Sequence, residues 1–245
     1  MQLNLRCQQL VQDEEGYATW RVQNVVGQWP AEKTALLLCD VWNSHWCRGA
    51  VARLDAMVER MEQVVRTVRD AGGLIVHAPS DTMDFYADSP ARKRAGAVPQ
   101  LDPPPDQERA DPPLPIDASD NGSDTGETET HKAWHRQHQA IGIDEERDII
   151  ADEGIEIYSY LQHAGIEHLL IMGVHTNMCV LHRTFAIKQM VRWGAEVALI
   201  RDLTDAMYNP AMPPYVSHDE GTRLVIEFIE KFWCSSVESG DILEV

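Results

Sequence analysis

One cysteine lies where a backbone could activate it as a nucleophile. The apolar stretch 169–174 predicts a buried strand, a tight turn follows, and Cys179 opens the next helical pattern. At the first turn of a helix, backbone N–H groups lack intrahelical acceptors and the helix dipole is positive. Both effects favour the thiolate, and the same N–H groups could hold an oxyanion. We therefore predict a nucleophilic Cys179; the alternative is a buried structural cysteine at a helix start.

A carboxylate follows the first apolar strand of the chain. Residues 35–39 read as a buried parallel strand that ends at Asp40. Parallel topology would bring this strand end close to Cys179. A carboxylate beside a thiol can accept its proton and later return it to a leaving amine. Asp40 is thus a candidate base, or it caps the following turn through the backbone of Asn43 or Ser44.

The elements that must position these residues alternate along the chain. Apolar runs and helical spacing predict strands at 35–39, 74–76, 140–143, 169–174 and 197–200, and helices at 50–70, 152–163, 179–193 and 217–232. Such alternation indicates an α/β fold: a parallel, Rossmann-like sheet with helices on both faces. Ser217 followed by Glu220 is a capping box for the last helix.

Two segments lie outside this alternation. Residues 1–33 carry period-two stretches that predict an N-terminal hairpin or arm. Residues 97–130 are rich in Pro, Gly, Ser, Asp and Glu and predict an acidic surface insertion, flexible in places. The insertion either keeps the protein soluble or acts as a lid or subunit-contact loop. We interpret residues 1–245 as one domain.

Composition excludes several classes of function. A net charge of −18 would repel a phosphate backbone, so no nucleic-acid partner is expected. The apolar runs are too short to span a membrane, and no secretory signal opens the chain, which favours the cytoplasm. The five cysteines form no C-x-x-C pair, so a zinc-ribbon or thioredoxin-like site is not expected.

Two motifs resemble those of a known superfamily. DVWNSHWC at residues 40–47 resembles the Asp-x-Gln-Asn-x-Phe opening of the isochorismatase-like cysteine hydrolases, and GVHTNMCV at residues 173–180 resembles their Gly-Val-x-Thr-x-x-Cys-Val nucleophile turn. This superfamily includes nicotinamidases, N-carbamoylsarcosine amidases, ureidoacrylate and biuret hydrolases, and isochorismatases. The order of strands and helices matches from about residue 34 to 232.

The resemblance implies the isochorismatase-like hydrolase fold and an Asp, Lys and Cys triad. Asp40 would be the base and Cys179 the nucleophile. The resemblance also implies a cis peptide bond between Val174 and His175, with the backbone amides of His175 and Cys179 as the oxyanion hole. Because members of the superfamily are commonly oligomeric, we expect a homo-oligomer.

The lysine of the triad has no match where the resemblance would place it, after the third strand. The segment 141–148 contains Arg147 as its one cation and no lysine. Lys132, further upstream, could fold back into the site and move protons, whereas an arginine could only hold charge. We rank Lys132 ahead of Arg147; the third option is a site without the lysine, altered or inert.

The ten histidines suggest no required metal. His131, His135 and His138 would share one face if their segment were helical, and could form a metal site, but a charge-balancing surface is the more common outcome. The metal-binding nicotinamidases have an Asp-x-His spacing after the second strand, and residues 77–81 lack it. We interpret His77 as a hydrogen-bonding residue at a strand end, and we expect no cofactor.

Five residues around the two motifs are expected to contact the substrate: Trp42, His45, Trp46, Asp81 and Asn177. The amphipathic rings suit a flat amide or a heteroaromatic ligand, although a tryptophan here could instead fill the core.

The prediction is therefore a cysteine-dependent hydrolase of a C–N bond in a small amide or ureide, acting through a Cys179 acyl-enzyme. The alternative is a non-catalytic member of the same fold that binds a ligand or assembles with other subunits. Vinyl-ether cleavage, as in isochorismatases, proceeds without a cysteine, and Cys179 argues against it.

Overall fold

The computed structural model describes residues 1–244. Its strands are β1 (Gln2–Gln12), β2 (Ala18–Gln28), β3 (Thr34–Cys39), β4 (Leu74–Ala78), β5 (Ile149–Ile150), β6 (His168–Val174), β7 (Glu196–Asp205) and β8 (Ser235–Val237). Its α-helices are α1 (Arg48–Asp70), α2 (Pro90–Ala95), α3 (Gly154–His163), α4 (Cys179–His182), α5 (Ile187–Arg192), α6 (His218–Phe232) and α7 (Ser239–Leu243), with short 3-10 helices at Ala31–Lys33 and Met83–Tyr86.

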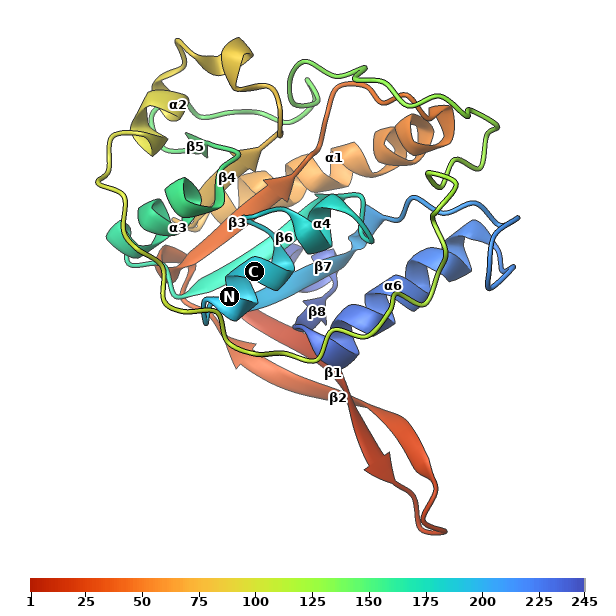
Figure 1. The fold of residues 1–245 in the computed structure, drawn as a ribbon. Coiled ribbons are helices and arrows are strands. Elements are labelled where there is room, and N and C mark those ends of the chain that lie inside the picture. The colour runs from red at the N-terminus through yellow and green to blue at the C-terminus, as the bar shows by residue number, and fades with distance from the viewer. Residues whose placement is uncertain (245) are drawn as a thin grey trace.

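The strands form one sheet in the order β2-β1-β8-β7-β6-β3-β4-β5 (Figure 1). All pairings from β8 to β5 are parallel, and only β1 pairs antiparallel, with β2 and with β8. The parallel core confirms the predicted α/β, Rossmann-like class. Every residue of β3 is buried, as its continuous apolar sequence requires in a strand covered on both faces.

Helices cover both faces of the sheet, and each face has its own core. Leu36 and Leu38 of β3 pack in the cluster that contains the apolar face of α1 and Ile242 of α7. Leu37 and Cys39 point to the opposite face and pack in the cluster with α3, α5 and α6. The two clusters hold β3 and β6 rigidly side by side, which fixes where their carboxyl ends lie.

The predicted strand at 140–143 is wrong. Ile141 is buried against the α1 cluster, but its N–H donates to the carbonyl of His138 in a turn. The edge strand is instead β5, a few residues later, which pairs with β4 through Val76 and Ile149. Burial of Ile141 explains the apolar pattern there without any strand partner.

The predicted helix at 179–193 is broken into α4 and α5. The chain leaves helical geometry at Arg183, where ψ is 151°. Phe185 is fully buried in the core, and the Thr184 hydroxyl accepts a hydrogen bond from the N–H of Gly154. Tertiary packing of these two residues therefore overrides the helical spacing. The last helix, in contrast, begins as predicted, with the Ser217 side chain accepting from the N–H of Glu220.

The N-terminal hairpin is present and the insertion is anchored. β1 and β2 pair along eleven residues each and join the sheet through Arg6 and Ser236 (Figure 1). Residues 97–130 contain no helix or strand, but the N–H of Gln107 donates to α5, and the Thr125 hydroxyl accepts from the first turn of α1. The insertion thus crosses the surface from α5 to α1. None of the helices described is long and apolar enough to cross a membrane.

Gly173, the second-last residue of β6, lies where the ends of β3 and β6 approach each other closely, and a substitution there tests this approach. Its φ is +127°, and a Cβ added there would lie 2.0 Å from the carbonyl oxygen of Cys39. Gly173→Ala should therefore lower the free energy of unfolding by on the order of 3 kcal/mol. Gly72→Ala is the matched control, because Gly72 also has a positive φ but nothing within 4 Å of its added Cβ. Equal losses in urea denaturation would contradict the close approach to Cys39.

Candidate active site

The site forms where the carboxyl ends of β3 and β6 meet. Cys39 pairs with Gly173, so Asp40 and the turn after Val174 leave the sheet side by side. That turn leads directly into α4, which begins at Cys179. The Cys179 thiol and the Asp40 carboxylate lie close enough for each to shift the pKa of the other. The predicted nucleophile and base are therefore brought together from positions far apart in the sequence.

The Asp40 carboxylate is fully buried and held through both oxygens. Its Oδ1 accepts from the backbone N–H of Ser80 at 2.7 Å, and its Oδ2 accepts from Arg183 Nε at 3.0 Å. Asp40 itself has a φ of +52°, a conformation uncommon outside glycine, asparagine and aspartate. Its side chain thus connects the end of β3 to the loop after β4 and to the turn after α4, and it does not cap Asn43 or Ser44.

Arg183 is the cation of this cluster, and the sequence analysis missed it. Besides Asp40, its guanidinium faces the Asp81 carboxylate, with Nη2 and Oδ2 3.6 Å apart. Its side chain is 32% exposed, whereas that of Asp40 is 0% exposed. One signal was available: Arg183 follows Cys179 by four positions, the spacing that places two residues on the same side of a helical turn.

The electrostatics of Cys179 differ from the prediction. Burial, followed by the Asp40 charge, raises the pKa of the Cys179 thiol well above its usual value, and Arg183 only partly opposes this. Since α4 has only four residues, its dipole is too short to outweigh burial. Burial also raises the pKa of Asp40, against Arg183 and the Ser80 and Cys179 hydrogen bonds. The resting site therefore holds a neutral thiol next to a carboxylate.

The turn before Cys179 contains a cis peptide bond and a backbone N–H group without an acceptor among the described residues. The Val174–His175 peptide bond is cis, as predicted. The N–H groups of Met178 and Val180 both donate to the His175 carbonyl, whereas the N–H of Cys179 has no acceptor among residues 1–244. The His175 amide faces the Cys179 sulfur and favours its charged form.

The two cations weighed from the sequence lie elsewhere. Lys132 Nζ donates to the backbone carbonyl of Asp81, the residue whose carboxylate faces Arg183. Arg147 pairs with Asp144 on an exposed surface. Neither has a contact with Asp40 or Cys179 in the part of the chain described. The structure thus places Lys132 near the mouth of the site and Arg147 away from it.

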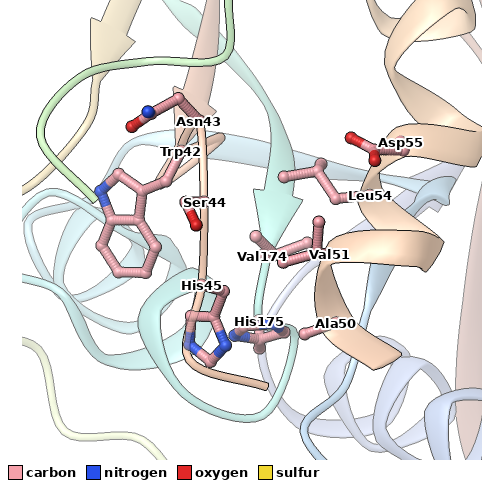
Figure 2. Close-up of a pocket in the computed structure, with 10 residues that line it drawn as sticks. All are labelled: Trp42, Asn43, Ser44, His45, Ala50, Val51, Leu54, Asp55, Val174 and His175. Atoms are coloured by element: carbon pink, nitrogen blue, oxygen red, sulfur yellow. The ribbon is translucent and has the colours of Figure 1, made fainter. Parts of the chain in front are cut away.

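Aromatic rings form one wall beside the turn that precedes Cys179. Trp42 stacks on Trp134 with ring centroids 4.0 Å apart, and both indole N–H groups donate to the Ser80 carbonyl. Trp134 comes from the segment after the insertion and was not assigned a role from the sequence. His45 lies against His175, with ring centroids 4.9 Å apart (Figure 2).

A small cavity lies between this wall and α1 (Figure 2). Its lining includes Trp42, His45 and His175, together with Val51 and Leu54 of α1. The cavity encloses about 10 Å³, which is the space that a single water molecule needs. Arg183 and Asp81 do not line this cavity, and their side chains are partly exposed, at 32% and 58%.

The remaining residues expected to bind substrate lie in different settings. Asp81 lies beside Arg183, as described above. Trp46 packs against a small cluster with Cys47. Asn177 is buried, and its side-chain amide both donates to and accepts from the backbone of Met207, at 2.9 Å in each case. This pairing joins the turn before Cys179 to the loop after β7, and it occupies the oxygen and one N–H of the Asn177 amide.

The histidines are bound into local contacts. Burial lowers the pKa of His45 to about 4 and that of His175 to about 3, so neither can be a cation at neutral pH. His77 bonds to Gln137 and Asp148, in agreement with a hydrogen-bonding role at a strand end. His135 bonds to Asn43, and His138 bonds to Asp55. Within residues 1–244, no group of three or more His, Cys, Asp or Glu side chains is arranged so that it could hold a metal ion.

Comparison with known proteins places this site in a family. Residues 34–211 match the isochorismatase domain, a span that includes both strand ends, the turn before Cys179, and Arg183. The chain belongs to the isochorismatase family. Members of this family are hydrolases, and the predicted superfamily is thereby confirmed. No curated protein matches the sequence.

Solved structures support the fold. A cysteine hydrolase from Pseudomonas syringae pv. phaseolicola has a TM-score of 0.56 at 14% identity, over 89% of this chain and 94% of that chain. An isochorismatase family protein from Burkholderia thailandensis has a TM-score of 0.51 at 15% identity, over 89% and 100%. An isochorismatase from Pseudomonas putida has a TM-score of 0.51 at 11% identity, over 86% and 90%. At these identities the likeness concerns the fold alone.

Proposed function

We propose that this member of the isochorismatase family hydrolyses a C–N bond in a small amide or ureide, with Cys179 as a covalent nucleophile. The observation that carries the proposal is the Asp40 carboxylate next to the Cys179 thiol, buried and held through both of its oxygens. A thiol whose pKa is raised cannot ionise by itself at neutral pH. An adjacent fixed base is what such a nucleophile needs.

The reaction would proceed in two halves. Asp40 accepts the thiol proton while the Cys179 sulfur bonds to the carbonyl carbon, and the carbonyl oxygen becomes an oxyanion facing the amides of His175 and Cys179. When the C–N bond breaks, Asp40 returns the proton to the leaving nitrogen, and a thioester remains. Asp40 then accepts a proton from water, whose oxygen attacks the thioester; the acid is released and the thiol regains its proton.

The protonated form of Asp40 is the reason for proposing that the bond cleaved is a C–N bond. An amine or ammonia leaves only with a proton, and a buried carboxyl with a raised pKa is a suitable donor. The stacked Trp42 and Trp134 suit a flat substrate. Since the cavity beside His45 is so small, we expect the substrate to enter from the Arg183 and Asp81 side.

A panel of small amides, N-carbamoyl compounds and ureides tests this function. Incubation with the wild-type protein should release ammonia from at least one compound class, together with an equal amount of acid from an amide, or of CO2 and amine from an N-carbamoyl compound or ureide whose terminal amide is cleaved. Acid without ammonia from ester substrates alone would argue against a C–N bond. If no compound is turned over, the result favours the alternative function, a non-catalytic protein of the same fold that binds a ligand or assembles with other subunits.

A further inference from the structure

The turn that carries the nucleophile also carries a cation. We propose that Arg183 is the positioning residue that holds Asp40 as an oriented carboxylate toward Cys179, in the role that the resemblance assigned to a lysine from another strand. This inference rests on the proposed function, but its test needs no substrate.

The geometry fixes the Asp40 carboxylate from two sides. Ser80 N–H engages Oδ1 and Arg183 Nε engages Oδ2, so the carboxylate plane cannot rotate freely. Asp40 is fully buried, and a buried carboxylate without a partner cation is costly. Arg183 supplies that charge with a hydrogen bond of 3.0 Å.

Few other groups near Asp40 could perform this role. The ionisable groups that face Asp40 are Arg183 and Cys179 from the α4 turn, and Cys39 from β3. Beyond Arg183 lies Asp81, with Lys132 on the Asp81 backbone carbonyl. Arg183 is thus the one cation among the described residues that contacts Asp40.

An arginine changes the chemistry that the cation can perform. Its guanidinium stays protonated at any pH at which the protein is folded, so it cannot carry a proton between Asp40 and Cys179. Its fork can engage two carboxylates at once, here Asp40 through Nε and Asp81 through Nη2. The proton therefore moves only between the Asp40 carboxylate and the Cys179 thiol or the reacting groups.

The sequence around Arg183 explains how it reaches Asp40. Arg183 stands four residues after Cys179, at the residue where α4 ends. The backbone turns there to an extended ψ of 151°, while Phe185 is buried in the core. A continuous helix would carry the following residues away along the surface. The break anchors Arg183 between the ends of β3 and β4.

The test is the pH dependence of Cys179 alkylation by iodoacetamide, followed peptide by peptide in Arg183→Gln, Arg183→Lys and the wild type. Arg183 lowers the pKa of both Asp40 and Cys179, so its loss raises both and leaves a smaller fraction of carboxylate and of thiolate at a given pH. Arg183→Gln should move the rise in alkylation rate upward by about one pH unit or more, roughly a tenfold loss of rate at pH 7. Arg183→Lys should restore most of this shift, because it keeps the charge.

Two controls separate positioning from folding. Arg66→Gln removes an exposed arginine that pairs with Glu62 on α1 and should leave the profile unchanged. Cys39 and Cys47 are fully buried and should stay unreactive in every folded variant. An unchanged profile in Arg183→Gln, or a shift that appears in Lys132→Gln instead, would overturn the proposal. A failed substrate panel with a shifted Arg183→Gln profile would overturn the proposed function and leave the role of Arg183 intact.

Discussion

Asp40→Asn should lower kcat/KM for the best substrate of the panel by roughly a thousandfold, within the range that general acid–base residues contribute. Asparagine can keep the contact with Ser80 N–H, but it cannot accept the proton of a thiol whose pKa is raised by burial. The loss should fall mainly on kcat. Steady-state kinetics with ammonia detection measures it.

Asp81→Asn is the informative comparison for this variant. Asp81 also faces Arg183, but its Oδ2 lies 3.6 Å from Nη2 and its side chain is mostly exposed. Asp81→Asn should therefore lower kcat/KM far less than Asp40→Asn, and mainly by raising KM. The pH profile adds a second criterion. The wild-type rate should fall as the pH drops below the raised pKa of Asp40, and Asp40→Asn should lack this limb. Equal effects of the two variants would contradict the assignment of Asp40 as the base.

Replacing Cys179 by alanine or serine should have the largest effect of any single change, a loss of at least about a thousandfold in kcat. Alanine removes the nucleophile. Serine keeps the size and a donor toward Asp40, but a hydroxyl is a much weaker nucleophile than a thiol. Both variants should fold and still bind substrate, because Cys179 lies at the start of α4 and not within the sheet.

The other cysteines provide the control for this prediction. Cys7 lies on β1, far in the sequence from the turn that precedes Cys179, and Cys7→Ser should keep full activity. Cys234 is partly buried, and this burial raises its pKa to about 12; the carboxylate that raises it further is Glu230, not Asp40. Activity that survives in Cys179→Ala but disappears in a Cys234 variant would place the nucleophile elsewhere.

The sequence predicted those parts of the site that depend on local patterns. Asp40 and the turn before Cys179 follow apolar strands, and parallel strands place such ends together, so both positions could be found without a structure. Most backbone elements followed for the same reason, apart from the strand expected at 140–143 and the continuous helix expected at 179–193. There, burial of Ile141 in a turn produced the same apolar pattern as a strand.

The rest depends on tertiary contacts; the four-residue spacing to Cys179 places Arg183 on the same side of the turn but does not show that it contacts Asp40. Arg183 reaches Asp40 only because Phe185 and the following residues leave the helix to fill the core. The pKa of Cys179 rises because burial exceeds the effect of a four-residue helix, and neither the burial nor the helix length was visible in the sequence. Asn177 is polar and adjacent to the nucleophile, yet its amide is occupied by the Met207 backbone.

The central claim is that a covalent bond forms between substrate and Cys179. Mass spectrometry of an acid-quenched reaction tests it most directly, with the most rapidly hydrolysed compound of the panel and a digest that separates all five cysteine peptides. We predict a mass increase equal to the acyl part of the substrate on the Cys179 peptide alone, absent in Cys179→Ala. Continued turnover in Cys179→Ala, or an acyl group on any other residue, would contradict the account.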